Sequence, residues 1–242
     1  MKVVAIIQAR MGSTRLPGKV LLDLSGKTVL ARVVERLRGA RSVDDLLVAT
    51  TDQPEDDAIV EACNRLSVAS FRGQENDVLD RYHQAALSAH ADVIVRITSD
   101  CPLIDPEVVD QTIHKLTSEA ADYASNCLDR RYPRGLDTEV IGAQALARAW
   151  REAAKPYQRE HVTPYIYEDP AQFRLASLIA DADYSHHRWT VDTPEDLQLV
   201  RAIYQRLGPG DFLWRDVLAL LDREPALVEL NRGVPQKALH TG

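Results

Sequence analysis

Three cations in a short glycine-containing stretch are the residues of this sequence whose types and spacing most directly suggest chemistry. The stretch IIQARMGSTRLPGKVL, residues 6–21, contains Arg10, Arg15 and Lys19 but no acidic residue, although the chain carries a formal net charge of −7. Glycines let backbone N–H groups approach a phosphate closely, and Arg and Lys add charge-assisted hydrogen bonds. The stretch therefore predicts a polyphosphate-binding loop, with a solvated basic turn as the alternative.

The spacing of this loop differs from that of the Walker A loop of P-loop NTPases. Five residues separate Gly12 from Gly18, where the Walker motif has four. Val20 stands where that motif requires Ser or Thr to reach a magnesium ion. The sequence thus excludes a P-loop and predicts a phosphate-binding loop of another kind.

Two aspartates at predicted strand ends form the second feature with chemical potential. Because Pro102 forces Cys101 toward extended geometry, no helix begins there and Asp100 is held at the end of its strand. Asp192 lies just before a capped helix start, on the end of another predicted strand. Mg²⁺ prefers one or two carboxylates together with phosphate oxygens and water. The two aspartates and the basic loop together predict a nucleotidyl transfer that uses Mg²⁺.

Other polar residues at strand ends have simpler explanations. In ATTDQPEDD, residues 49–57, Asp52 is predicted to cap the following helix, with Pro54 in its first turn. Thr50 and Thr51 are then left for contacts with a base or a ribose. Asp105 precedes a proline and is predicted to be a helix cap.

The elements that must position these residues follow from the apolar pattern. Short β-branched runs alternate with amphipathic stretches, which is typical of βαβ units around a mostly parallel sheet flanked by helices. The predicted strands cover residues 3–7, 46–49, 68–71, 92–97, 138–141, 173–179 and 188–191. The predicted helices cover residues 29–37, 54–66, 78–90 and 106–116, and two more helices end the chain. In such sheets ligands bind outside the carboxyl ends of the strands, where the loop and both aspartates stand.

The composition predicts one soluble α/β domain over residues 1–242, with an irregular segment at about 122–170. Apolar residues make up 45% and charged residues 27% of the chain, and no composition shift divides it. The acidic balance argues against a nucleic-acid partner. Only five apolar residues, 3–7, precede the first polar ones, so we expect no signal peptide, no membrane span and a cytoplasmic location. The odd number of cysteines, without a C-x-x-C pair, suggests neither disulfides nor zinc.

The opening stretch resembles the ARxxSxRLPGK signature of the cytidylyltransferases that activate acidic sugars, the CMP-Kdo and CMP-sialic acid synthetases. TSDCPLIDP and VDTPEDL resemble the two metal-aspartate motifs of these enzymes. GQENDVLDRY, YPRGLDTEVI and REHVTPYIY are similar to the branch that serves spore coat polysaccharide biosynthesis, and the resemblance runs over about residues 1–205. It implies a Rossmann-like sheet of the nucleotide-diphospho-sugar transferase type.

The resemblance also implies roles for particular residues. The residues implied as catalytic are Arg10, Lys19, Asp100 and Asp192, of which the two aspartates would bind Mg²⁺ and the two cations would hold the triphosphate. The nucleotide-binding residues expected from the strand ends and the resemblance together are Gln8, Ala9, Arg10, Gly12, Ser13, Arg15, Lys19, Thr50 and Arg72. The reaction implied is transfer of CMP from CTP to an acidic sugar or a phosphorylated or phosphonate acceptor, with release of pyrophosphate.

The stretch YPRGLDTEV, residues 132–140, is the predicted acceptor wall. Arg134, beside Arg131, could meet an anion, and Asp137 or Glu139 could meet a hydroxyl or an amine. A surface loop that leads into an edge strand is the alternative. The histidines His161, His186 and His187 are expected to pack or to lie at an interface.

Two other function classes remain open at this point, a glycosyltransferase that uses a nucleotide sugar and a non-catalytic nucleotide-binding protein. Pyrophosphate release from CTP and an acceptor would separate them from a cytidylyltransferase. Tyrosines and a tryptophan are dense in the segment 122–170, and the related synthetases pair through the equivalent region. The resemblance therefore implies a homodimer with this segment at its centre.

Overall fold

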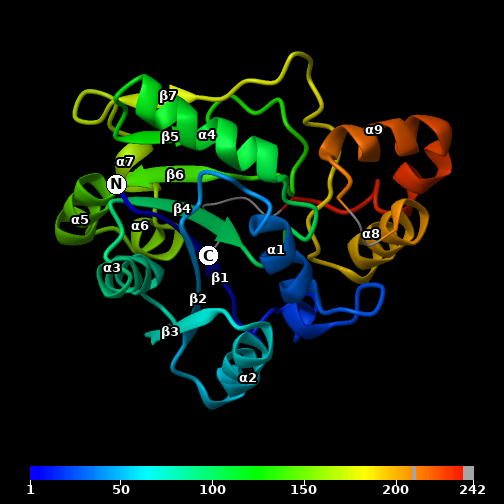
Figure 1. Cartoon of the computed structure of the whole chain (residues 1–242), viewed down its shortest axis with the longest axis horizontal. Helices are drawn as coiled ribbons and strands as arrows, with labels where there is room; N and C mark the ends of the chain where they lie inside the picture. The colour runs from blue at the N-terminus through cyan, green and yellow to red at the C-terminus, as the bar shows by residue number, and fades with distance from the viewer. Residues whose placement is uncertain (209–210, 237–242) are drawn as a thin grey trace.

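The part of the chain that the structure describes, residues 1–208 and 211–236, is built around a seven-stranded, mostly parallel sheet (Figure 1). In this computed structural model the strand order is β3-β2-β1-β4-β6-β5-β7. The strands are β1 (Val3–Gln8), β2 (Asp45–Thr51), β3 (Ala69–Gly73), β4 (Val93–Thr98), β5 (Tyr123–Ser125), β6 (Glu139–Gly142) and β7 (Leu175–Ser177). β6 runs antiparallel to its neighbours β4 and β5, and the other pairs are parallel. The predicted fold class is confirmed.

Helices cover both faces of this sheet (Figure 1). The α-helices are α1 (Val29–Leu37), α2 (Asp57–Leu66), α3 (Val78–Ser88), α4 (Pro106–Ser118), α5 (Ala143–Glu152), α6 (Pro156–His161), α7 (Pro164–Tyr167), α8 (Pro194–Leu207) and α9 (Trp214–Arg223). The 3₁₀ helices are η1 (Lys19–Leu21), η2 (Pro54–Asp56) and η3 (Pro225–Leu230). Among the described residues, none of these helices combines the length and the apolar character needed to cross a bilayer.

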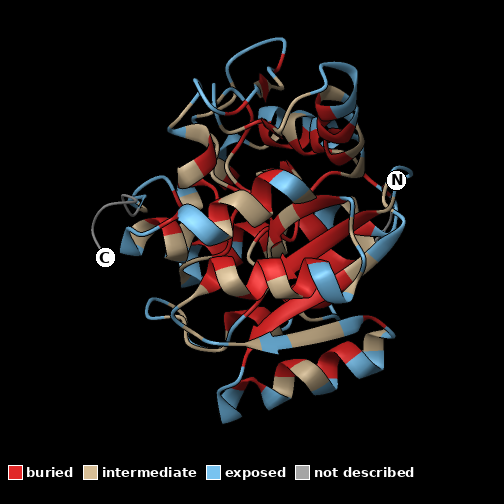
Figure 2. Cartoon of the chain, turned by 90° about the vertical axis from the view of Figure 1, so that its left-hand side faces the viewer, coloured by how far each residue is buried: buried red, intermediate tan, exposed pale blue. Residues whose placement is uncertain are grey.

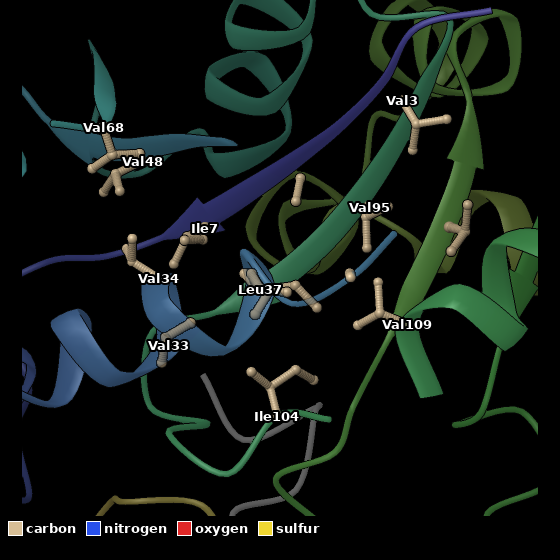
Figure 3. Close-up of a cluster of buried hydrophobic side chains, with 14 of the residues drawn as sticks. Val3, Ile7, Val33, Val34, Leu37, Val48, Val68, Val95, Ile104 and Val109 are labelled. Atoms are coloured by element: carbon tan, nitrogen blue, oxygen red, sulfur yellow. The ribbon is translucent and has the colours of Figure 1, made fainter. Parts of the chain in front are cut away.

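The first strand shows why the core has two layers. Its VVAII run is buried throughout, as expected for a central parallel strand covered on both faces. Successive side chains point to opposite faces, so Ile7 packs with α1 and α4, whereas Val4 and Ile6 pack with α3 and α5. Figure 3 shows Ile7 beside Val34 of α1, with Val109 of α4 farther along the same layer. Figure 2 shows buried central strands inside the molecule and exposed helix surfaces outside.

A third apolar cluster joins α8 and α9 to the loop that precedes α8, on the right of Figure 1. Trp189 of this loop is buried, and its backbone N–H donates to the carbonyl of Arg134, in a second loop, at 2.7 Å. Gly135 makes this approach possible. Its φ is +104°, and a Cβ there would lie 2.6 Å from the carbonyl carbon of Trp189.

The strand predicted over residues 188–191 is wrong. These residues make one isolated bridge, between Arg134 and Arg188, and belong to no strand. The N–H of Val191 donates to the carbonyl of Asp100 at 2.7 Å, so loop carbonyls satisfy backbone groups that a ladder would otherwise pair. The strand predicted over residues 173–179 is shortened to β7, and the three-residue β5 was not predicted.

The start of the helix predicted over residues 54–66 also differs. The segment is divided into η2 and α2, and the residue that precedes η2 is Gln53, which makes no side-chain cap bond. The capping role predicted for Asp52 is therefore wrong. The cap predicted at Asp105 is confirmed, because its carboxylate accepts hydrogen bonds from two N–H groups in the first turn of α4, at 2.9 and 3.2 Å.

The aromatic residues of the segment 122–170 are all buried or half-buried within the chain. The ring of Trp150 stacks on His83 with 4.3 Å between centroids, and Tyr165 packs edge-on against Phe173. Packing within one chain therefore accounts for their density. The homodimer implied by the resemblance stays a prediction.

Candidate functional site

A cavity of about 910 Å³ lies at the carboxyl ends of β1 and β4. Its walls come from the loop after β1, the loop between β3 and α3, the residues after β4, and α6. Five predicted nucleotide-binding residues line it, namely Gln8, Arg10, Ser13, Arg15 and Lys19. Asp100 and Asp192 line it as well, so the structure brings together the four residues that were predicted to be catalytic.

The loop after β1 is folded on itself by its glycines and by one carbonyl. The carbonyl oxygen of Met11 accepts hydrogen bonds from the N–H groups of Ser13, at 2.8 Å, and Gly18, at 3.0 Å. Gly18 has a φ of +68°, in the left-handed region that favours glycine. Lys19 follows this turn as the first residue of η1, and its side chain lines the cavity.

Asp56 fastens this loop to the sheet, a role that the sequence did not predict. Its carboxylate is buried and accepts hydrogen bonds from the N–H of Met11 at 2.7 Å, the hydroxyl of Thr50 at 3.0 Å and the N–H of Thr51 at 3.1 Å. The two threonines are therefore engaged below the cavity. The signal for this role was the position of Asp56, five residues after a Thr-Thr pair at the end of a strand.

Lys19 joins the two aspartates. Its ammonium donates to Asp100 Oδ2 at 2.8 Å and to Asp192 Oδ1 at 2.7 Å, although the three residues are far apart in the sequence. The lysine is only 8% exposed. Two carboxylates that would otherwise repel each other thus share one cation, and we call these three residues the Lys19 cluster.

The remaining oxygens of the Lys19 cluster are also paired. Asp100 Oδ1 accepts from the hydroxyl of Thr98 at 2.6 Å. Asp192 Oδ2 is paired with Arg15 at 2.9 Å and with Arg188 at 2.7 Å. Every carboxylate oxygen of the cluster therefore has a donor from the chain itself.

Burial and charge act in opposite directions on the pKa values in this cluster. Burial disfavours the ammonium of Lys19, but the attraction of Asp100 and Asp192 outweighs it, so the pKa of Lys19 is raised. Burial also disfavours the carboxylate of Asp100, but Lys19 and the hydrogen bond from Thr98 outweigh it, so the pKa of Asp100 is lowered. Both groups are therefore charged at neutral pH.

The two aspartates provide the hard oxygen donors that Mg²⁺ requires, and they converge on one point that a cation already occupies. Within residues 1–208 and 211–236, no group of three or more His, Cys, Asp and Glu side chains is arranged to hold a metal. This donor set fits an ion whose other ligands are phosphate oxygens and water.

Four predicted nucleotide-binding residues lie outside the cavity lining: Ala9, Gly12, Thr50 and Arg72. Arg72 is engaged at the edge of the sheet, where it donates to the carbonyls of Thr51, at 2.9 Å, and Gln53, at 2.8 Å, and pairs with Asp57. The structure therefore does not bring Arg72 to the phosphate loop. Its place in β3, two strands away from β1, explains this separation.

The predicted acceptor wall is divided among three places. Arg134 lines a separate cavity of about 310 Å³, together with His186 and His187. Asp137 forms a two-bond pair with Arg130, at 2.6 and 2.9 Å. The three predicted acceptor residues thus do not converge on the nucleotide cavity.

Glu139 has a structural environment. It is buried, paired with Arg96, and accepts hydrogen bonds from the hydroxyls of Tyr123, at 2.5 Å, and Thr163, at 2.6 Å. These contacts join β6 to β4, β5 and the start of α7. A carboxylate with this many donors has little capacity left for a substrate.

Two groups of cavity residues were missed by the sequence reasoning. His161 lines the cavity from the end of α6, beside Arg159, which is held by Asp77 at 2.6 Å. Arg81 lines it from α3, the helix that packs against α6. Both stand in stretches quoted above for their resemblance, GQENDVLDRY and REHVTPYIY, so the signal was present but gave no role to single residues.

Comparison with known proteins agrees with this geometry. The profile of the cytidylyltransferase family matches residues 4–209. The spore coat polysaccharide biosynthesis protein SpsF of Bacillus subtilis is 36% identical over 231 residues, which cover 92% of this chain and 95% of that protein. The 3-deoxy-manno-octulosonate cytidylyltransferase of Anaeromyxobacter dehalogenans is 32% identical over 238 residues, which cover 83% and 97%. A cytidylyltransferase structure from Leptospira borgpetersenii matches with a TM-score of 0.91 and 33% identity, and covers 98% of this chain and 100% of its own.

Proposed function

The chain belongs to the cytidylyltransferase family of CTP-dependent enzymes, and we propose that it transfers CMP from CTP to an oxygen of an acidic sugar, or of a related phosphorylated or phosphonate acceptor. Pyrophosphate is the leaving group. The observation that carries the proposal is the Lys19 cluster, which lines one large cavity together with Arg10 and Arg15.

The cations of this cavity suit the charge that moves during such a transfer. As the bond from the α-phosphorus to the bridging oxygen breaks, negative charge grows on the departing pyrophosphate. Arg10 and Lys19 both line the cavity, so they could stabilise the departing pyrophosphate through charge-assisted hydrogen bonds. Arg15 remains paired with Asp192 and keeps the loop in place.

Binding of the triphosphate would exchange partners within the Lys19 cluster. Lys19 would move its ammonium from the aspartates to phosphate oxygens, and Asp100 and Asp192 would then hold Mg²⁺. A bound Mg²⁺ supplies Lewis-acid polarisation of a phosphoryl oxygen. The net charge of the cluster would rise by two units with the bound ion, which suits a polyanionic ligand.

The acceptor would enter from the wall formed by α6. His161 and Glu160 line this wall, and Arg159 is fixed there by Asp77, so the wall offers both charge signs and an imidazole. The relative from Anaeromyxobacter acts on 3-deoxy-manno-octulosonate by its name, and SpsF serves spore coat polysaccharide. We extend from them only the general class, an anionic sugar-like acceptor for a surface glycan.

A pyrophosphate-release assay tests the proposal. Each of the four nucleoside triphosphates is incubated in MgCl₂ with 2-keto-3-deoxy acids, sugar phosphates and phosphonates. We expect release with CTP and at least one anionic acceptor. Release that is independent of any acceptor, or that requires a nucleotide sugar, would contradict the proposal.

Two aspartate variants provide the matched comparison. Asp100→Asn removes one carboxylate of the Lys19 cluster, and Asp181→Asn removes an exposed carboxylate that pairs with Arg215 at 3.1 Å, outside the cavity. The first variant should lose CTP-dependent release by a factor of about 10² or more, as for removal of one catalytic electrostatic contact. The second should retain it.

A homodimer is proposed on the resemblance alone. Light scattering at micromolar protein gives the mass directly. A monomer mass would reject the dimer without affecting the proposed reaction.

A further inference from the structure

Asp192 of the Lys19 cluster lies in a loop that is not part of the sheet. Residues 188–191, which precede it, make one isolated bridge and belong to no strand. Backbone bonds to carbonyls of two other loops hold Trp189 and Val191 of this stretch, at 2.7 Å each. The position of the Asp192 side chain must therefore depend on further contacts.

Asp196, in the first turn of α8, holds the backbone at Asp192. Its carboxylate is buried, and Oδ2 accepts hydrogen bonds from the N–H groups of Asp192, at 3.0 Å, and Thr193, at 3.1 Å. The contact with Thr193 belongs to the capping box of α8. The contact with Asp192 goes beyond a helix cap, because it fixes a residue that lines the nucleotide cavity.

Arg188 holds the side chain of Asp192. Its Nη2 donates to Asp192 Oδ2 at 2.7 Å and to Asp196 Oδ2 at 3.0 Å, and its Nε donates to Asp196 Oδ1 at 2.9 Å. Asp192 Oδ2 is therefore engaged, and Oδ1 is the oxygen that accepts from the ammonium of Lys19. In the exchange of partners proposed above, Arg188 would keep Oδ2 while Lys19 leaves Oδ1.

Asn231 fixes both Arg188 and Asp196 from a distant part of the sequence. It is buried and follows η3 directly. Its amide nitrogen donates to the carbonyl of Arg188 at 2.9 Å and to Asp196 Oδ1 at 2.8 Å, so both amide hydrogens are used. Both partners are acceptors only, and no other atom of the asparagine side chain could serve them.

The segment that carries Asn231 is anchored by apolar packing. α9 and η3 pack against α8, and Leu227 of η3 belongs to the same apolar cluster as Trp189. Asn231 lies beyond residues 4–209, the part of the chain that the family profile matches. A segment outside the matched part thus supports a residue of the Lys19 cluster.

We propose that Asn231 is a positioning residue for metal binding, because it holds Arg188 and Asp196 in place and these hold the carboxylate of Asp192. The proposal rests on the proposed function, since that function gives Asp192 its role toward Mg²⁺. Asn231 lies outside the lining of the nucleotide cavity, so it touches neither nucleotide nor metal. Its effect passes through the two residues that it contacts.

Calorimetric binding of inorganic tripolyphosphate, in MgCl₂ and in EDTA, tests the proposal. Asn231→Leu keeps a neutral, branched side chain but removes both donors, and Asn64→Leu is the same substitution at an exposed residue of α2, outside the cavity. Asn231→Leu should lower the affinity in MgCl₂ roughly 10- to 100-fold, the range for loss of a contact that orients a metal ligand, and should leave the affinity in EDTA unchanged. Asn64→Leu should change neither value.

The outcomes separate this proposal from the proposed function. An equal fall in MgCl₂ and in EDTA would overturn the proposal, because a merely structural role does not act through the metal. Unchanged affinity in both would also overturn it, while the proposed function would stand. If wild type binds tripolyphosphate no better in MgCl₂ than in EDTA, the role of Asp192 toward Mg²⁺ fails, and this proposal fails with it. If Asn231→Leu does not fold, Asn231→Ser, which is smaller and keeps one donor, decides by the same comparison.

Discussion

The two sides of the nucleotide cavity differ in how far their polar groups are paired with other groups of the chain. In the Lys19 cluster each carboxylate oxygen has a donor, at 2.6 to 2.9 Å. The other side contains Gln8, Arg81 and Arg96, which we call the unpaired wall, and their buried donors and one acceptor have no partner within the described residues. A ligand must therefore displace existing contacts on the first side, whereas the unpartnered atoms of the second side are buried and hold no contact to displace.

This difference indicates different contributions to stability. Removal of one member of the Lys19 cluster should be strongly destabilising, because it leaves a buried charge without its partner. The unpaired wall costs stability, since a buried donor without an acceptor loses its hydration. Variants on the two sides of the cavity and at the loop attachment test this difference in stability.

Lys19→Met should give the largest effect. It leaves Asp100 without its ammonium partner, and because these carboxylates are partly exposed we expect a loss of about 2–4 kcal/mol in the free energy of unfolding, at the lower part of the range for breaking a buried pair. Urea denaturation measures it. Lys27→Met is the control, because Lys27 pairs with Glu35 on the surface and its loss should change stability by less than about 1 kcal/mol. Equal effects in the two variants would contradict a special role of the cluster.

Asp56→Asn should give the next effect. An amide keeps the shape of the side chain but turns one acceptor into a donor that faces the N–H of Met11 or the threonines. We expect a loss of about 1–3 kcal/mol and weaker binding of tripolyphosphate, because the phosphate loop loses its attachment to β2. Denaturation and calorimetry on the same sample test both parts. Unchanged stability would show that the carboxylate of Asp56 does not hold the phosphate loop to β2.

The pH dependence of Lys19→Met should differ from that of wild type. In wild type the pKa of Asp100 is lowered, so its contribution to stability is present above its ordinary pKa near 4 and is lost only as the pH falls below that value. In the variant the burial of Asp100 is no longer outweighed by Lys19, so its folded pKa is raised and the variant should gain about 1 kcal/mol as the pH falls from 7.5 to 5. Melting temperatures at the two pH values check the sign. A flat profile in the variant would mean that Arg15 and Arg188 suffice for the whole cluster.

Arg81→Met should give the smallest change in stability, with the opposite sign. The substitution removes an unpaired buried cation but also the hydrogen bond to the carbonyl of Gln74, so we expect stability to stay the same or to rise by up to about 1 kcal/mol. Thermal unfolding without nucleotide measures it. A loss of more than 2 kcal/mol would show that Arg81 is held by contacts that stabilise the fold, contrary to the contrast drawn here.

The residues that the sequence placed correctly depended on local patterns. The apolar run of β1 and the amphipathic spacing of residues 29–37 predicted their elements closely, because each pattern is complete within one segment. The loop cations and Asp100 were predicted to meet because parallel strands bring their carboxyl ends to one edge. Asp192 joins them from a loop and not from the strand end that was predicted for it. The sequence predicted that the cations would bind phosphate and that the aspartates would bind a metal ion. It did not predict that Lys19 pairs with both aspartates.

The residues that were misplaced depended on contacts between distant segments. Arg130 takes Asp137 away from any acceptor, and Arg96 does the same for Glu139, and neither pairing has a periodic signal. Trp189 and Val191 have the composition of a strand, yet their backbone groups bond to loops. Arg81 stands next to the buried Tyr82 in a helix, where a charged residue is ordinarily expected at the surface.

The close approach at Gly135 limits how this chain can diverge. A Cβ at position 135 would lie 2.6 Å from the backbone of Trp189, and the same loop continues from Trp189 to Asp192. Any side chain at position 135 would push this loop outward and carry Asp192 away from Lys19. The surrounding loop residues can exchange to suit a new acceptor, whereas this position is closed to substitution. In a library of variants selected for activity, tolerance should therefore fall sharply at one residue of an otherwise permissive loop.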